Sequence, residues 1–132
     1  MKPSLPPRQL TDVGLNMFVD TVKLRELNLP IIDVPLERLL WHFDMPIWAK
    51  DNTDDWNLTP WEVIRKKVGT SVHRERVAES NLAYPIIVTE YNGRLVILDG
   101  VHRLVKAHEN GRTSIQAKLI PTDFLSLTEF QS

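Results

Sequence analysis

The sequence contains no cysteine among its 132 residues. Disulfide bonds, thiolate metal ligands and cysteine nucleophiles are therefore excluded as features of this chain. The sequence also lacks a surplus of positive charge, since 16 lysines and arginines stand against 17 aspartates and glutamates and the net charge is −1. A free-standing DNA-binding protein usually carries a basic surplus that neutralises phosphates, so we do not expect this chain to bind DNA by itself.

Long apolar runs are also missing. No stretch reaches the length of a membrane span, and the N-terminus lacks the apolar run of a signal peptide. We therefore expect a cytoplasmic protein without a membrane partner, and the missing cysteines fit that compartment. The length, the hydrophobic fraction of 42% and the charged fraction of 25% suit one globular domain.

We divide the chain into a leader with a helix over residues 1–30, a core over 31–122 and a tail over 123–132. Three of the nine prolines fall in the first eight residues, which is typical of an extended leader. The elements that the patterns predict before residue 84 are a helix from Thr11 to about Leu27, a strand at Ile31–Pro35, a helical turn at 36–40, an irregular segment over 41–56 and a short helix over 71–80.

A further helix start lies at Thr59-Pro60-Trp61-Glu62. Threonine followed three residues later by glutamate forms a capping box, and proline suits the first helical position. The spacing predicts a helix that ends at Gly69, with Trp61, Ile64 and Val68 on one face.

The best-defined pattern lies between residues 84 and 120. It predicts in order a strand, a type I′ hairpin turn, a returning strand, a helix and a final strand, at Tyr84–Thr89, Asn92-Gly93, Arg94–Leu98, His102–Glu109 and Ser114–Ile120. The returning strand is almost continuously apolar, so we expect burial on both of its faces. These elements indicate an α+β fold, a small mixed β-sheet with packed helices.

The returning strand runs directly into the next helix through Asp99-Gly100-Val101-His102-Arg103. The first amides of a helix have no partner within the helix, and together with the helix dipole they form a site for an anion. Gly100 lets a ligand approach the backbone, Arg103 can grip a phosphate with its guanidinium fork, His102 can add a donor, and Asp99 can cap the helix. Two other interpretations stay open: ordinary capping with solvated side chains, and an Arg103 that turns inward to pair with Asp99 or Glu37.

This run resembles the ParB/sulfiredoxin superfamily. In that superfamily a hairpin leads into a glycine–x–His/Arg–Arg turn, followed by a helix rich in arginine, leucine and alanine and by a closing strand. The run Ile31–Leu39 also resembles the opening strand of the superfamily, so the resemblance covers roughly residues 31–120. The tryptophan-rich middle of the chain has no counterpart in it.

The resemblance implies that the turn holds nucleotide phosphates, with ATP, ADP or CTP and Mg²⁺ as the expected cofactors. Members include ParB, a CTP-dependent DNA clamp; sulfiredoxin, which repairs oxidised peroxiredoxin with ATP; and ParB-like kinases of free serine. Val101 stands where sulfiredoxin has its cysteine. About a dozen residues follow Ile120, so we expect neither the helix-turn-helix domain of ParB nor the long extension of the serine kinases, whose Asp-Gly-His-His-Arg turn is the nearest match.

The resemblance also assigns roles to residues. The candidate nucleotide-binding residues are Asp99, Gly100, Val101, His102 and Arg103 in the turn, and His73, Arg74 and Arg76 in the helix before the hairpin. The serine kinases use a glutamate after the first strand as general base, so Glu37 and Asp44 are candidate catalytic residues, together with His102. The simpler alternatives are that both carboxylates are exposed and that the cationic cluster is a solvated face balanced by Glu75 and Glu79.

Four tryptophans fall between residues 41 and 61: Trp41, Trp48, Trp56 and Trp61. They could stack a base or contact a partner, but aromatic residues in an irregular segment more often attach it to the core. Neither the histidines nor Asp51, Asp54 and Asp55 have the spacing of a metal site, so we expect no metal bound by the protein alone.

Two functions of different classes follow from these patterns. The first is an enzyme, a small-molecule phosphotransferase or nucleotide hydrolase that uses ATP, ADP or CTP. The second is a non-catalytic module that binds a nucleotide and acts through a partner protein. Nucleotide binding is common to both.

Overall fold

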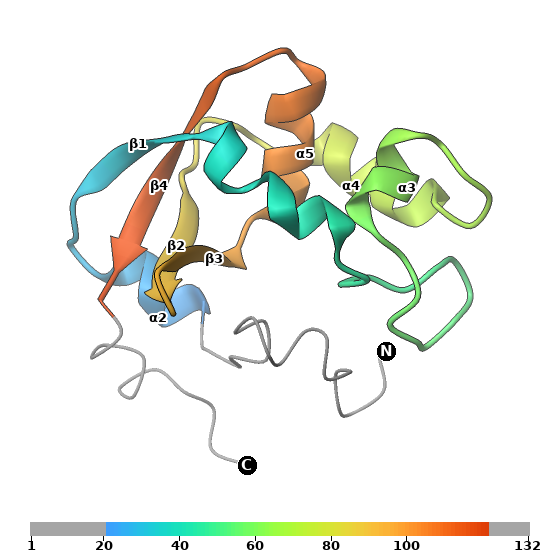
Figure 1. Ribbon diagram of the computed structural model, residues 1–132, viewed down its shortest axis with the longest axis horizontal. Helices are drawn as coiled ribbons and strands as arrows, with labels where there is room; N and C mark the ends of the chain where they lie inside the picture. The colour runs from blue at the N-terminus through green and yellow to red at the C-terminus, as the bar shows by residue number, and fades with distance from the viewer. Residues whose placement is uncertain (1–20, 122–132) are drawn as a thin grey trace.

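A four-stranded mixed sheet organises the computed structural model, which describes residues 21–121 (Figure 1). The helices of this part are α2 (Thr21–Glu26), the 3-10 helices η1 (Leu36–Arg38) and η2 (Leu40–Asp44), α3 (Pro60–Ile64), α4 (Ser71–Glu79) and α5 (Val101–Glu109). The strands are β1 (Ile31–Pro35), β2 (Ile86–Tyr91), β3 (Arg94–Asp99) and β4 (Ser114–Ile120). None of the helices between residues 21 and 121 has the length and apolar character that a membrane crossing requires.

The strand order is β1-β4-β2-β3, with β4 parallel to β2 and the two outer pairs antiparallel. The β2–β3 hairpin turns at Asn92 and Gly93, whose φ angles of 53° and 77° are both left-handed, as a type I′ turn requires. The expected hairpin, helix and closing strand are therefore confirmed, and with them the α+β fold with a small mixed sheet. The first strand of the hairpin covers Ile86–Tyr91, two residues later than expected.

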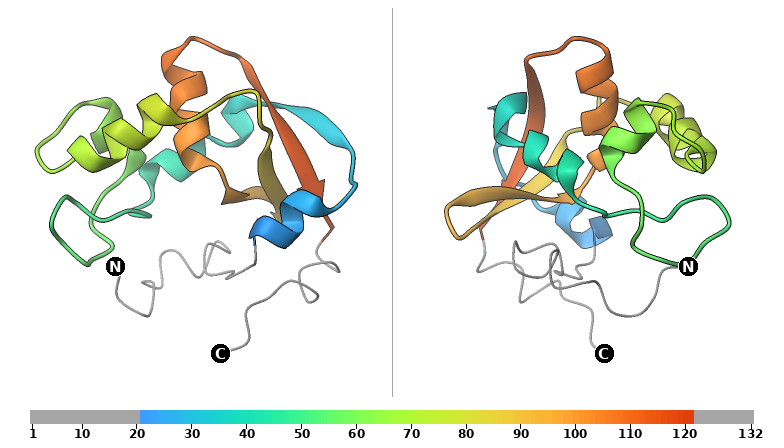
Figure 2. Two further views of the ribbon diagram at one scale, coloured as in Figure 1. Left: turned by 180° about the vertical axis from the view of Figure 1, so that it is seen from behind. Right: turned by 45° about the vertical axis from the view of Figure 1, so that its right-hand side comes forward.

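Both faces of the sheet are buried at the central strand β2. Helices α3, α4 and α5 lie together on one side, where Ile86 and Val88 join the main core (Figure 2). The alternate residue Ile87 packs with Leu24 of α2 and with Ile120 in a second, smaller cluster. This alternation places α2 on the opposite face and explains why the central strands read as continuous apolar runs.

The outer edge of β3 is covered by side chains of η2. The Trp41 Nε1–H donates to the carbonyl of Leu95 over 3.2 Å, and the Ile97 N–H donates to His42 Nε2 over 3.0 Å. The other ring nitrogen of His42 donates to the carbonyl of Leu39 over 2.7 Å. Desolvation by burial is the main cause that lowers the pKa of His42 from 6.5 to about 4. The imidazole is thus a neutral bridge between Leu39, the residue that joins η1 to η2, and β3.

The expected capping box at the start of α3 is confirmed. The Glu62 N–H donates to Thr59 Oγ1 over 3.3 Å, and the Thr59 N–H donates back to Glu62 Oε1 over 3.0 Å. The expected end of this helix was wrong, because α3 stops at Ile64 rather than at Gly69. Lys66 adopts a left-handed φ of 55°, which ends the helix and leaves Val68 94% exposed.

The tryptophan-rich segment packs on the core as expected, with Phe43, Ile47 and Trp48 all buried. It is less irregular than expected at its start, where η2 forms. Of the expected helix from Thr11 to Leu27, the structure describes the part from Thr21 to Glu26 as α2. Residues 11–20 of that helix and the tail over 123–132 lie outside the described residues.

Candidate functional site

A cavity of about 410 Å³ opens between the 48–53 loop and the helices α4 and α5. The loop contributes Trp48 and Lys50, α4 contributes His73 and Arg76, and α5 contributes His102. Three residues that the sequence singled out, His73, Arg76 and His102, are therefore brought to one place from two separate helices. We call this space the α4–α5 cavity.

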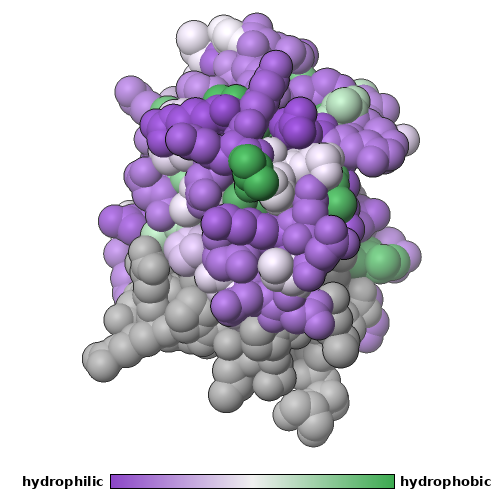
Figure 3. All heavy atoms as spheres, turned by 90° about the vertical axis from the view of Figure 1, so that its right-hand side faces the viewer, coloured by the Kyte–Doolittle hydropathy of each residue, from purple (hydrophilic) through white to green (hydrophobic). Residues whose placement is uncertain are grey.

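The face that carries α3, α4 and the neighbouring loop is mostly hydrophilic, with single apolar residues between the polar ones (Figure 3). Two exposed apolar side chains lie at the start of α4: Val72, which is 43% exposed, and Val68, which is three residues before the helix begins. Scattered residues of this kind do not form the contiguous apolar patch of a protein–protein interface. The face therefore suits a polar ligand.

The two histidines of the α4–α5 cavity form one hydrogen-bonded pair. His73 Nδ1 lies 2.9 Å from His102 Nε2, and the two rings are nearly parallel at an interplanar angle of 8°. Trp48 stacks on both rings, with centroid distances of 4.5 Å to His73 and 4.3 Å to His102. The indole thus fixes the plane of the pair.

This geometry decides what the pair can do chemically. In the contact between Nδ1 and Nε2 one nitrogen must donate and the other accept, so the tautomer of each ring depends on the other. The two rings therefore act as one unit whose donors and acceptors are set together, and the Asp51 carboxylate interacts electrostatically with His73.

Asp51 holds the loop to the start of α4. Its carboxylate accepts hydrogen bonds from the backbone N–H of Ser71 over 3.0 Å, from the N–H of Val72 over 3.1 Å and from the Ser71 hydroxyl. The hydroxyl of Ser71, followed by the amide of Val72, lowers the pKa of Asp51. Asp51 is therefore the carboxylate cap of α4, and it lines the α4–α5 cavity in its charged form.

The start of α5 has a glycine at the N-cap position. Gly100 adopts a left-handed φ of 116° there, and a glycine has no side chain with which to cap the helix. The expected capping by Asp99 was therefore wrong: the carboxylate of Asp99 lies instead between two guanidinium groups, those of Arg25 at 3.6 Å and Arg103 at 3.7 Å.

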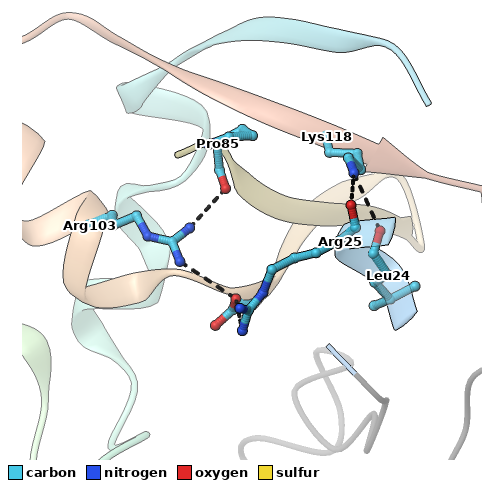
Figure 4. Close-up of polar contacts among 6 residues, drawn as sticks. Leu24, Arg25, Pro85, Arg103 and Lys118 are labelled. Carbon is cyan, nitrogen blue, oxygen red and sulfur yellow. Dashed lines mark hydrogen bonds and ion pairs between the residues drawn. The ribbon is translucent and has the colours of Figure 1, made fainter. Parts of the chain in front are cut away.

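Arg103 points away from the α4–α5 cavity. Its Nη1 donates to the carbonyl of Pro85 over 2.8 Å, and its Nη2 faces Asp99 (Figure 4). This is the inward-pointing alternative rather than the phosphate-gripping one. Gly100 contributes to the same packing, because a Cβ built on it would lie 2.6 Å from Ile86 Cγ2. In this turn, Gly100 and Arg103 join α5 to the start of β2.

The other expected site residues lie elsewhere. Arg74 donates from Nε to the Thr70 hydroxyl over 3.1 Å and lines a different hollow. Glu37 is exposed and lines a hollow near β1, and Asp44 is exposed at the end of η2. Neither Glu37 nor Asp44, and neither Asp99 nor Val101, lines the α4–α5 cavity. Within residues 21–121, no group of three or more histidines and carboxylates could hold a metal ion.

The tryptophans mainly hold the irregular segment in place. Trp41 packs on His42 and carries the Arg94 guanidinium 4.7 Å above its ring, and Trp61 packs edge-on against Phe43. Trp48 is 5% exposed, so it offers the cavity an edge rather than a free stacking face. Packing of the segment, the commoner of the two alternatives, accounts for these contacts.

A comparison with solved structures found a protein of similar structure. The chain is similar to the crystal structure of sulfiredoxin from Arabidopsis thaliana, with 18% sequence identity and a TM-score of 0.37, over 74% of this chain and 94% of that chain. No model of a protein family matches the chain, and no curated protein matches it. At this TM-score the superposition is loose, so the α+β fold is assigned from the sheet and helices themselves.

Sequence reasoning missed the place of Lys50 in the cavity, the capping of α4 by Asp51 and the stacking of Trp48 on the histidines. Asp51 had a weak local signal, because an aspartate close to a helix start can cap it. However, it caps a helix that begins 20 residues later in the chain, and nothing in the sequence marks that pairing. Trp48 and Lys50 belong to an irregular segment whose path only the tertiary structure defines.

Proposed function

We propose that the α4–α5 cavity binds the phosphate groups of a nucleotide. The observation that carries the proposal is the meeting of the His73–His102 pair with the cationic side chains of Lys50 and Arg76 in one cavity. Imidazole, ammonium and guanidinium groups are the side-chain donors that bind phosphate through charge-assisted hydrogen bonds. His102 is the second residue of α5, so the ligand would lie near the positive end of that helix dipole.

The charge and size of the cavity support this ligand. Lys50 and Arg76 contribute two positive charges, and the one negative charge, on Asp51, is already bound by the amides of α4. A volume of about 410 Å³ lies in the range of about 300–1,000 Å³ that small-molecule sites occupy. The resemblance of residues 84–120 to the ParB/sulfiredoxin superfamily, whose turn holds nucleotide phosphates, favours the same ligand.

Of the two functional classes, the arrangement favours the non-catalytic module that acts through a partner protein. A phosphotransferase needs a base beside the acceptor hydroxyl, and the expected carboxylate bases Glu37 and Asp44 lie outside the cavity. The third candidate, His102, does line the cavity, but its Nε2 is hydrogen-bonded to His73. The carboxylate that does line it, Asp51, is held by Ser71 and Val72. ATP, ADP or CTP with Mg²⁺ is thus proposed as a bound effector rather than as a phosphate donor.

The test measures the thermal unfolding of the full chain with ATP, ADP, CTP and GTP, each with and without Mg²⁺. Selective stabilisation by one of them identifies the nucleotide, because a ligand that binds the folded state raises its unfolding temperature. Titration calorimetry then compares Arg76→Ala with Arg38→Ala, an exposed arginine of η1 that does not line the cavity.

We expect Arg76→Ala to weaken binding about tenfold to a hundredfold, since a hydrogen bond to a charged group contributes about 1.5–3 kcal/mol. Arg38→Ala should leave the affinity unchanged. The proposal is refuted if none of the nucleotides raises the unfolding temperature, or if the two variants lose the same amount of nucleotide affinity. Release of phosphate from the bound nucleotide would favour the enzyme over the module.

A further inference from the structure

A second hollow, of about 570 Å³, lies behind the α5 turn. Its walls come from α2, β1, the start of β2, α5 and β4, and the residues used below are Arg25, Ile31, Tyr84, Ile87, Arg103 and Lys118. It shares no lining residue with the α4–α5 cavity. We call it the α2–β4 hollow.

Its lining carries more positive than negative charge. Arg25 and Arg103 face one carboxylate, Asp99, at 3.6 and 3.7 Å, so two guanidinium groups share one negative charge (Figure 4). The Oδ2 atom of Asp99 is buried without a hydrogen-bond partner, which shows that neither arginine closes a full bidentate pair with it. Guanidinium donors therefore remain for a further acceptor.

Lys118 adds charge without adding a donor. Its Nζ donates to the carbonyls of Arg25 over 2.6 Å and of Leu27 over 2.8 Å, with Leu24 at 3.5 Å, and thereby caps the end of α2. Carbonyl dipoles solvate the ammonium but do not neutralise it. The hollow therefore carries two positive charges in excess, one from the arginine pair and one from Lys118.

The remaining walls are apolar. Ile31 is 53% exposed and Tyr84 is 64% exposed at the mouth, while Ile87 is buried in the floor. Large apolar side chains exposed beside an excess of cations fit a ligand with one anionic end and one apolar end. Inorganic phosphate would use the charge but leave this apolar surface in water.

We infer that the α2–β4 hollow binds a small organic carboxylate with an aromatic or branched apolar body. The planar guanidinium fork matches the geometry of a carboxylate, and Arg25, which is 58% exposed, can reach it from the mouth. The apolar body lies against Ile31 and Tyr84. This site is separate from the proposed nucleotide site, so each proposal can fail without the other.

The test titrates the full 132-residue chain with 3-phenylpropionate and follows backbone amide shifts by NMR. The neutral 3-phenylpropanamide and inorganic phosphate are titrated in parallel. We expect dissociation in the range of about millimolar for a ligand of this size, with the largest shifts at the amides of Tyr84 and Ile87.

The variant Arg25→Gln keeps a polar side chain but removes the charge, and Arg38→Gln is the matched control. We expect Arg25→Gln to weaken 3-phenylpropionate binding roughly fivefold, the effect of an exposed charge pair of about 1 kcal/mol. Arg38→Gln should bind like the unchanged protein. Circular dichroism of Arg25→Gln verifies that the fold is retained.

Three results overturn the inference. If the neutral 3-phenylpropanamide binds as tightly as 3-phenylpropionate, the positive charge of the hollow does not contribute to binding. If inorganic phosphate binds as tightly as 3-phenylpropionate, the apolar walls do not contribute. No shift at Tyr84 and Ile87 up to the solubility limit of 3-phenylpropionate removes the site. Nucleotide binding in the Arg25→Gln variant should stay unchanged, which separates this test from that of the α4–α5 cavity.

Discussion

Acid should destabilise this protein through one buried histidine. His42 is fully buried, donates from Nδ1 to Leu39 and accepts the Ile97 N–H at Nε2. A second proton would have to go on Nε2, where it would face the N–H of Ile97. Protonation therefore requires that the hydrogen bond between His42 and Ile97 of β3 break.

The magnitude follows from the two pKa values of His42. Its pKa is 6.5 in the unfolded chain and about 4 in the folded protein, a difference that corresponds to about 3 kcal/mol. Between these values the unfolded chain binds more protons, so the free energy of unfolding falls as the pH falls. The contribution of His42 should be fully present above about pH 6.5 and lost by about pH 4.

Urea unfolding followed by tryptophan fluorescence, at fixed ionic strength from pH 4 to pH 7.5, measures this loss. The variant His42→Gln keeps a polar side chain but cannot titrate. It should be less stable near pH 7 and show a weaker dependence on pH, and the difference between the two curves isolates His42 because all other titrating groups are common to both. Parallel curves for the two proteins would refute the assignment.

Two further predictions concern the turn before α5. A methyl group on Gly100 would lie 2.6 Å from Ile86 Cγ2, and the residue would have to keep a φ of 116°. Gly100→Ala should therefore lower the free energy of unfolding by about 3 kcal/mol. The control Gly111→Ala has a φ of 74° and open space around it, so it should lower this free energy by about 1 kcal/mol. Arg103→Ala leaves the Pro85 carbonyl without its donor and should cost about 2 kcal/mol while nucleotide affinity stays within twofold. Thermal and urea unfolding measure the stability of these variants, and calorimetry measures the affinity. If Arg103→Ala greatly weakens nucleotide binding and leaves the stability unchanged, Arg103 binds the phosphate and this assignment is wrong.

The part of the fold that the sequence predicts best is the part in which neighbours along the chain decide the structure. The Asn92-Gly93 turn and the capping box at Thr59 depend on contacts within four residues, and both are confirmed. The end of α3 was mispredicted because Lys66 takes a left-handed φ that no local residue preference indicates. Gly69 is the residue that the pattern favours for that role.

The candidate site could be predicted only in part. The sequence singled out His73 and His102 separately, but their hydrogen bond joins residues 29 positions apart on different helices. The direction of Arg103 depended on whether the Pro85 carbonyl lay within reach, which is a property of the packed structure. Residue types therefore indicated the chemistry, while the tertiary structure decided which donors share a cavity.

The cover that η2 places on β3 has a consequence for self-association. An outer strand with unpaired backbone groups can act as a template for a strand of another molecule. Here the indole of Trp41 and the imidazole of His42 occupy the outward carbonyl of Leu95 and amide of Ile97, so the sheet cannot be extended at that position. Because protonation of His42 breaks one of these two bonds, acid near pH 4 should free a segment of strand edge as well as weaken the fold. In acid, β3 could then pair with a strand of another molecule and cause aggregation. At neutral pH, the uncharged imidazole of His42 prevents this pairing.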